Sequence, residues 1–280
     1  MANIPYIIVS PGYKNYHGGI RALYRLCFLL KKRGYESYIC NILFEPQNCP
    51  FEVEHINKNS TKYLEVMNKN PIVIYPEIVQ ENILSAIRPV GFIMGTNFAK
   101  KQIYNPSFYW EKELMPEGMN IKEHLLCLDI IEHDLFNTDN ITKKRDIITV
   151  WVGKGHPDGL KLIPEKDYTL ITNEYPATRQ ELANLLKSSK KFYTCDFYSS
   201  LIEEALLCGC PVVLLSNQRG FAELHKSMRP SLYGVTTDLS EESFKKAVDT
   251  LPSCLQIYKD KLVLPEEERI LNFIKITQDM

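Results

Sequence analysis

The chain has 280 residues, of which 45% are hydrophobic and 24% charged, and its formal net charge is −1 at pH 7. This is the mix of a soluble globular protein, and it excludes a disordered chain, which lacks such an apolar share. The net charge gives no electrostatic indication of a nucleic-acid partner, and the length allows one large domain or two of common size.

Targeting and metal-binding patterns are missing from the sequence. The apolar run near the N-terminus is short and has no basic leader, so we expect a cytoplasmic protein without a signal peptide or membrane span. The 8 cysteines form no C-x-x-C pair and the 6 histidines show no metal-ligand spacing. We therefore expect buried reduced thiols and neither a bound metal nor another cofactor.

The first half of the chain begins with a strand, a glycine-bearing loop, a helix and a second strand. Residues 5–10 have a buried-strand pattern, and the helix that follows carries its apolar residues on one face and ends at Arg33-Gly34. Further strands are predicted at 35–43, 72–75, 90–94 and 125–131. The aromatic-rich segment 97–120 has no regular pattern and would hold short strands or a substrate-lining loop.

A polar stretch at 137–146 separates this half from a second series of strands and helices. Strands are predicted at 147–152, 168–172, 191–195 and 211–215, and helices at 179–188, 200–208, 241–251 and 265–280. Thr178 and Glu181 have the spacing of a capping box, and so do Ser200 and Glu203.

Alternating strands and helices with buried strands predict parallel sheets covered on both faces. We therefore predict an α/β protein with two Rossmann-like, doubly wound domains that face a cleft. The N-terminal domain would comprise residues 1–137 with the helix 265–280 packing back on it, and the C-terminal domain residues 141–264. Ligands of such domains bind beyond the carboxyl ends of the strands.

The most specific motif lies in the segment 191–215, KFYTCDFYSSLIEEALLCGCPVVLL. Asp196 and Glu204 are separated by seven residues, and Ala205, Gly209 and Pro211-Val212 follow. This stretch resembles the donor-binding motif of retaining glycosyltransferases of the GT-B fold, especially family four. The family usually has Glu at the position of Asp196. Residues 216–223 also fit the family, which has a glycine and a glutamate there.

The resemblance implies a nucleotide-sugar site in the C-terminal domain. Asp196 would lie near the sugar and act in catalysis, and Glu204 would accept hydrogen bonds from the ribose hydroxyls. The helix start would hold the diphosphate, because free N–H groups and the helix dipole favour anions there. Tyr198, Ser199 and Ser200 are the donor-binding candidates in this loop. Glu204 can alternatively be an ordinary solvated helix residue.

A second motif, Gly153-Lys154-Gly155, ends the first strand of the C-terminal domain. The family has a glycine and a basic residue here, whose charge meets the donor diphosphate, so Gly153 and Lys154 are candidates for that role. The alternative is a solvent-exposed loop lysine. Thr172 and Asn173, with Glu174, follow the next strand and are candidates for the wall that binds the base.

His17-Gly18-Gly19 follows the first strand of the chain. The family has a Gly-Gly at this helix start, near the transferred sugar, which makes Gly18 and Gly19 donor-binding candidates, since glycine lets a ligand approach the backbone. His17 is a candidate general base. An ordinary strand-to-helix turn with a structural histidine is the alternative.

The function implied is transfer of a sugar from a nucleoside diphosphate sugar to a hydroxyl of a glycan or lipid-linked acceptor, metal-independent and retaining, in bacterial-type surface glycan synthesis. The basic helix that follows Gly19 would allow peripheral contact with the inner face of a membrane; its charges can equally be a solvated face. Two alternatives remain, a non-catalytic nucleotide-binding module of a larger assembly and a periplasmic-type binding protein. The donor, the acceptor and the oligomeric state do not follow from the sequence.

Overall fold

The computed structural model describes residues 3–43, 49–95, 104–139, 141, 144–196, 199–215 and 233–280. The chain divides into two compact units, one formed by Met1–Ile130 with Leu262–Met280 and the other by Ile131–Lys261. Each unit holds one sheet in which every pair of neighbouring strands is parallel. The prediction of an α/β protein with two Rossmann-like domains is confirmed.

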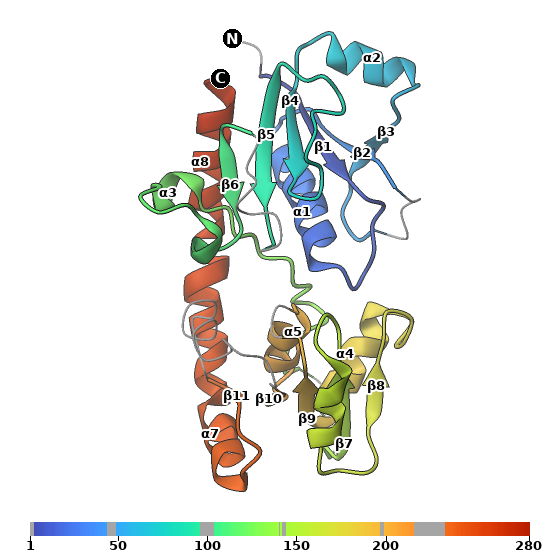
Figure 1. Ribbon diagram of the computed structural model, residues 1–280, viewed down its shortest axis with the longest axis vertical. Helices are drawn as coiled ribbons and strands as arrows, with labels where there is room; N and C mark the ends of the chain where they lie inside the picture. Colours follow the sequence, from blue (N-terminus) through green and yellow to red (C-terminus); the bar gives the residue numbers. More distant parts are fainter. Residues whose placement is uncertain are drawn as a thin grey trace. The chain divides into compact units, whose positions relative to one another are not determined.

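Unit 1 contains a six-stranded sheet with helices on its faces (Figure 1). Its strands are β1 (Tyr6–Ser10), β2 (Ser37–Asn41), β3 (Glu54–Ile56), β4 (Ile72–Pro76), β5 (Arg88–Ile93) and β6 (Ser107–Tyr109). Its helices are α1 (Gly18–Lys32), α2 (Thr61–Met67), α3 (Ile121–His124), α8 (Glu266–Gln278) and the short 3₁₀ helix Lys112–Leu114. The strand order β3-β2-β1-β4-β5-β6 is that of a dinucleotide-binding Rossmann sheet. In this order the chain adds strands on one side of β1 up to β3 and on the other side from β4 onward.

Unit 2 contains a five-stranded sheet in the order β11-β10-β9-β7-β8. Its strands are β7 (Ile147–Trp151), β8 (Thr169–Ile171), β9 (Ser189–Thr194), β10 (Val212–Leu214) and β11 (Val235–Thr236). Its helices are α4 (Arg179–Lys187), α5 (Leu201–Leu207), α7 (Glu241–Tyr258) and the 3₁₀ helix Pro157–Leu162, and a π-helical turn, Lys259–Val263, follows α7. Counted within the unit, the order is 2-1-3-4-5, the flavodoxin-like arrangement.

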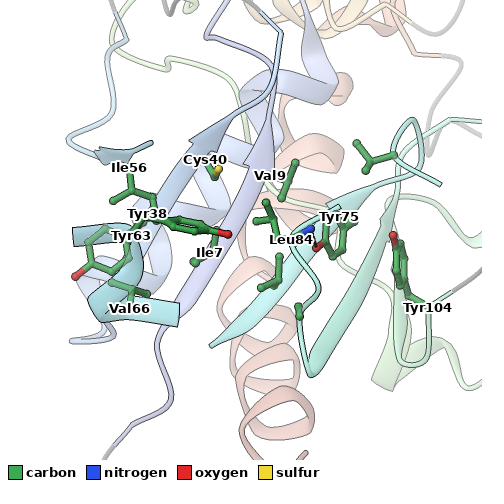
Figure 2. Packing of buried hydrophobic residues seen from close by; sticks show 13 residues of the cluster. Ile7, Val9, Tyr38, Cys40, Ile56, Tyr63, Val66, Tyr75, Leu84 and Tyr104 are labelled. Atoms are coloured by element: carbon green, nitrogen blue, oxygen red, sulfur yellow. Dashed lines mark hydrogen bonds between the residues drawn. The ribbon is translucent and has the colours of Figure 1, made fainter. Parts of the chain in front are cut away.

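One face of the unit 1 sheet carries a core of alternating strand residues (Figure 2). Ile7 and Val9 of β1 lie in this core beside Tyr38 and Cys40 of β2, as the two-residue side-chain period of a strand requires. The helix α2 and the segment after β4 cover it with Tyr63, Val66, Val79, Leu84 and Ala86. Tyr75 and Tyr104 stack with ring centroids 4.9 Å apart.

The opposite face of β1 packs against α8. The hydroxyl of Tyr6 lies 2.8 Å from that of Thr277, and its ring lies 6.1 Å from the ring of Phe273. Burial raises the pKa of Tyr6 to about 12, so this hydroxyl is protonated at all physiological pH values. These contacts make α8 part of the unit 1 core.

The ends of two helices follow from their sequences. Gly34, with φ of 81°, donates its N–H to the carbonyl of Lys31 and ends α1, as the predicted glycine cap requires. The predicted capping box of Thr178 and Glu181 at the start of α4 is confirmed. The predicted box of Ser200 and Glu203 is wrong, because Ser200 is the N-cap of α5 but makes no side-chain capping bond.

The strand predicted at 125–131 is wrong. Only Leu125 forms an isolated bridge, with Tyr109. The N–H of Leu126 donates to the carbonyl of Tyr109 in β6, and beyond Leu126 side chains bind the backbone. Arg269 donates to the carbonyl of Cys127, the N–H of Asp129 donates to Glu266, and Arg21 donates to the carbonyl of Ile130.

Candidate functional site

The topology of unit 2 points to the carboxyl ends of β7 and β9. These strands are neighbours, while the chain from β7 continues to β8 on one side and the chain from β9 continues to β10 on the other. The loops after β7 and β9 therefore diverge, and ligands of open α/β sheets bind at such a switch point. Gly153-Lys154 and Asp196 occupy these two loops.

The two loops are joined by a hydrogen bond from the backbone N–H of Lys154 to Oδ2 of Asp196, 3.0 Å long. Asp196 is buried, with 5% of its surface exposed. A Cβ built on Gly153 would overlap this carboxylate and the Trp151 indole nitrogen, and the φ of Gly153, 53°, also favours glycine. The glycine is therefore required by the close approach of the loops.

Gly155 makes a similar approach, because a Cβ there would overlap the carbonyl of Cys195. Cys195 is buried beside this loop, and burial, with the nearby Asp196, raises the pKa of its thiol. A raised pKa keeps the thiol protonated, so Cys195 is not an activated nucleophile.

The side chain of Lys154 is exposed and makes no hydrogen bond or ion pair within the part of the chain that the structure describes. Its ammonium group is thus uncommitted, while its backbone is fixed by Asp196. A loop whose backbone is held in place and whose lysine ammonium is exposed at a switch point is suited to bind an anionic ligand.

The start of α5 follows directly after Asp196. The N–H of Ser199 donates to the carbonyl of Asp196 at 3.4 Å, and the hydroxyl of Ser199 accepts from the N–H of Leu201 at 3.3 Å. Ser199 and Ser200 are therefore brought close to the Lys154 loop through Asp196. Tyr198 and residues 216–223 lie outside the described residues.

Glu204 lies in the first turn of α5 and is completely buried. Both of its carboxylate oxygens accept hydrogen bonds from Arg179, at 2.7 and 3.1 Å. Its predicted contact with a ribose stays a prediction, and in the structure Arg179 binds both of its oxygens. The alternative of a solvated helix residue is wrong, because Glu204 has no exposed surface.

Arg179 joins three segments of unit 2. Its Nε donates to Glu132 at 2.7 Å, and its guanidinium lies 4.4 Å from the centre of the Phe136 ring. Burial opposes its charge, yet the carboxylates of Glu204 and Glu132 together raise the pKa of Arg179 above its ordinary value. No sequence pattern indicates this network, since an arginine in the first turn of a helix is usually exposed.

The loop after β8 carries the residues predicted to bind the base. The hydroxyl of Thr172 accepts from the N–H groups of Glu174 and Tyr175, so it is engaged within the loop. Asn173 is exposed at the tip. Because β8 neighbours β7, this loop lies beside Gly153-Lys154 at the same edge of the sheet.

His17, Gly18 and Gly19 belong to unit 1, at the carboxyl end of β1, where that sheet also reverses. His17 is the N-cap of α1 and makes no side-chain capping bond. A Cβ on Gly19 would meet Met94 at an ordinary contact distance of 3.8 Å. Packing therefore does not require glycine at position 19, and the roles of these residues stay predictions.

The basic side chains of α1 are mostly committed within unit 1. Arg25 pairs with Glu266 at 2.7 Å, Arg33 pairs with Glu267, and Lys31 pairs with Glu52 at 3.3 Å. Most of the charges that suggested contact with lipid head groups thus bind carboxylates. Among the described residues, none of the helices combines the length and apolar character needed to cross a membrane.

No group of three or more potential ligands placed to hold a metal ion occurs among the described residues. None of the eight cysteines, all of which lie in the described ranges, forms a disulfide, and six of them are buried.

Comparisons with known proteins find similarity at the level of structure only. No family model and no curated protein matches the chain. A solved α-glucosyltransferase, in complex with UDP and a 13-mer DNA, is 12% identical with a TM-score of 0.51, and the match covers 99% of this chain and 95% of that one. This likeness shows the fold.

Two further structures are similar to this chain with TM-scores below 0.5. The wall teichoic acid polymerase TagF is 11% identical with a TM-score of 0.48, over 98% of this chain and 88% of that one. A protein assigned as a UDP-N-acetylglucosamine 2-epimerase from Listeria monocytogenes is 13% identical with a TM-score of 0.46, over 98% of this chain and 94% of that one.

Proposed function

We propose that this chain is a glycosyltransferase that takes its sugar from a nucleoside diphosphate sugar. The observation that carries the proposal is the uncommitted ammonium of Lys154, on a loop that Asp196 fixes at the switch point of the unit 2 sheet. The fold shared with an α-glucosyltransferase whose structure contains UDP supports it.

In this proposal the diphosphate lies against Lys154 and the start of α5 at Ser199 and Ser200. When the bond from the sugar to the diphosphate breaks, the departing phosphate oxygen gains negative charge. A cation already in place stabilises that charge more than it stabilises the bound donor, and this difference lowers the barrier.

The other candidates keep the roles that the motifs predict. Thr172 and Asn173 would face the base, and Gly153 would let the Lys154 loop lie close to Asp196. Tyr198 is a further donor-binding candidate. In unit 1, Gly18 and Gly19 stay donor-binding candidates and His17 a candidate general base. Asp196 would help to orient the sugar through the loop that it fixes.

The finer features of the reaction rest on the resemblance of the segment 191–215 to family four. They are retention of the anomeric configuration, independence of metal ions, and a glycan or lipid-linked acceptor in surface glycan synthesis. The ammonium of Lys154 can supply the positive charge that a divalent cation supplies at other diphosphate sites.

The first prediction tests catalysis by release of free nucleotide from UDP-, GDP-, ADP- and CDP-linked sugars. We expect release with at least one donor, about 10-fold or more slower in Lys154→Ala, since one charge-assisted hydrogen bond contributes about 1.5–3 kcal/mol. Lys166→Ala is the control, because this exposed lysine precedes β8 and so lies at the amino ends of the strands, away from Lys154. Equal rates in the wild type and Lys154→Ala would contradict the role of Lys154.

A non-catalytic nucleotide-binding module is the second candidate. It is favoured by the engagement of both predicted carboxylates, Asp196 with the Lys154 loop and Glu204 with Arg179. The assay for this candidate contains cell extracts that supply glycan and lipid-linked acceptors. Tight binding of a nucleotide sugar without any release of nucleotide in this assay would support the binding module over the enzyme.

A further inference from the structure

Tyr175 is an aromatic residue that the predicted site did not include. Its side chain is 53% exposed and makes no hydrogen bond or ring contact with any described residue. Its backbone is fixed, however. The N–H of Tyr175 donates to the hydroxyl of Thr172 at 3.0 Å, and its carbonyl accepts from the N–H of Thr172 at 2.7 Å. The ring is therefore presented to solvent from a closed, four-residue loop.

This loop has a defined place relative to Lys154. The residues Trp151 and Ile171 are paired across β7 and β8, so the loops that follow them begin about 4.8 Å apart, at the same edge of the sheet. Asp196 follows β9, one strand further along. The exposed ammonium of Lys154 and the exposed ring of Tyr175 thus lie on adjacent loops.

We infer that Tyr175 is the platform on which the base of the nucleotide stacks while Lys154 binds its phosphates. The inference rests on the proposed function and names the part of the donor that this loop contacts. Every base has a π face, so stacking gives affinity with little choice between bases. The exposed amide of Asn173, which can both donate and accept, would supply that choice.

Tyr168 serves as a matched control. It is 39% exposed and, like Tyr175, makes no side-chain hydrogen bond or ring contact within the described part of unit 2. It precedes β8, so it lies at the amino edge of the sheet, away from Lys154. The two tyrosines thus lie at opposite ends of β8, Tyr168 before the strand and Tyr175 after it.

The test compares nucleoside diphosphates with inorganic pyrophosphate in calorimetric titrations. The probe is whichever of UDP, GDP, ADP and CDP binds the wild type most tightly. We expect Tyr175→Ala to weaken its binding at least about fivefold, as loss of one base–aromatic stack does. We expect Tyr175→Phe and Tyr168→Ala to bind it as the wild type does. Pyrophosphate has no base, so its affinity should be equal in all of these proteins and lower in Lys154→Ala.

The outcomes separate this inference from the proposed function. Unchanged nucleotide affinity in Tyr175→Ala overturns the inference and leaves the proposed function intact. Weakened pyrophosphate binding in Tyr175→Ala also overturns it, because the effect is then on the loop and not on a base. If none of the four nucleotides binds the wild type, the proposed function fails, and the inference fails with it. Equal melting temperatures show that each variant is folded.

Discussion

Glu204 and Arg179 show how a single buried residue changes the interpretation of a motif. A carboxylate in the first turn of a helix after a glycosyltransferase-like loop predicts a ribose contact, and the structure places its two oxygens on a guanidinium. A buried ion pair adds little net stability compared with an apolar pair, but loss of one partner leaves the other charge buried and unpaired. The two roles of Glu204 therefore make opposite predictions.

Glu204→Gln should lower the free energy of unfolding by about 1.5–3 kcal/mol, because Arg179 would lose the charge of one of the two carboxylates that it binds and would keep Glu132. Glu203→Gln is the matched control, since Glu203 is the adjacent residue and is only half-buried. It should unfold at nearly the same denaturant concentration as the wild type. A Glu204→Gln protein that keeps full stability but loses nucleotide affinity would support the ribose contact instead.

Gly153→Ala should destabilise the protein more than Gly34→Ala. Both glycines have a positive φ, so alanine at either position incurs a backbone cost of about 1–2 kcal/mol. Only at Gly153 would the new Cβ also meet Asp196 and Trp151, while nothing lies within 4 Å at Gly34. We expect an additional cost of about 1–3 kcal/mol at Gly153 from this overlap. Equal melting temperatures for the two variants would contradict the described contact between the loops.

Among the elements, α8 depends most on residues far away in the sequence. The N–H of Ile4 donates to the side chain of Gln278, and Arg25 binds Glu266. Side chains of α1 and α8 also bind the backbone of the segment 127–130. That segment has the apolar composition of a strand. Its composition could not show that side chains rather than a sheet would bind its N–H and carbonyl groups.

Phe273→Ala should therefore destabilise unit 1 by about 3–5 kcal/mol, since Phe273 has no exposed surface and its ring lies 4.6 Å from that of Phe108. Leu271→Ala, on the same helix but 52% exposed, should change the free energy of unfolding by less than about 1 kcal/mol. Similar losses in the two variants, measured by urea denaturation, would mean that α8 contributes through its helix propensity and not through this face.

Elements with a clear apolar pattern were predictable. The helix α1 follows from its apolar spacing and its glycine cap, and β8 and β10, with three residues each, lie within longer apolar runs. The equally short strands β3 and β11 were not predicted, and β6 lies in the segment 97–120, whose irregular pattern did not distinguish short strands from a loop. The predicted helix 241–251 was too short. The helix α7 continues through Pro252 to Tyr258, although proline inside a helix removes one hydrogen bond. Burial of Cys254 and Tyr258 accompanies this continuation.

For the whole molecule, the alternation of strands and helices was enough to predict two parallel sheets. The order of the strands was not predictable, because pairing between distant strands leaves no mark on a local pattern. The order nevertheless decides the candidate site, since it makes β7 and β9 neighbours and so brings Lys154 and Asp196 together. The partner of Glu204 stayed hidden for the same reason, as Arg179 is 25 residues away in the sequence.

The account depends on a nucleotide binding at the carboxyl edge of the unit 2 sheet. Hydrogen–deuterium exchange of the wild-type protein, with and without a saturating nucleoside diphosphate, tests this location directly. Amide groups at 152–155, 172–175 and 199–204 should exchange more slowly with the nucleotide bound, because the ligand would cover them or stabilise their loops. The same protein with Lys154→Ala should need a higher nucleotide concentration for this protection. Protection confined to other segments would contradict the account. So would the absence of any protection at nucleotide concentrations that saturate the wild-type protein.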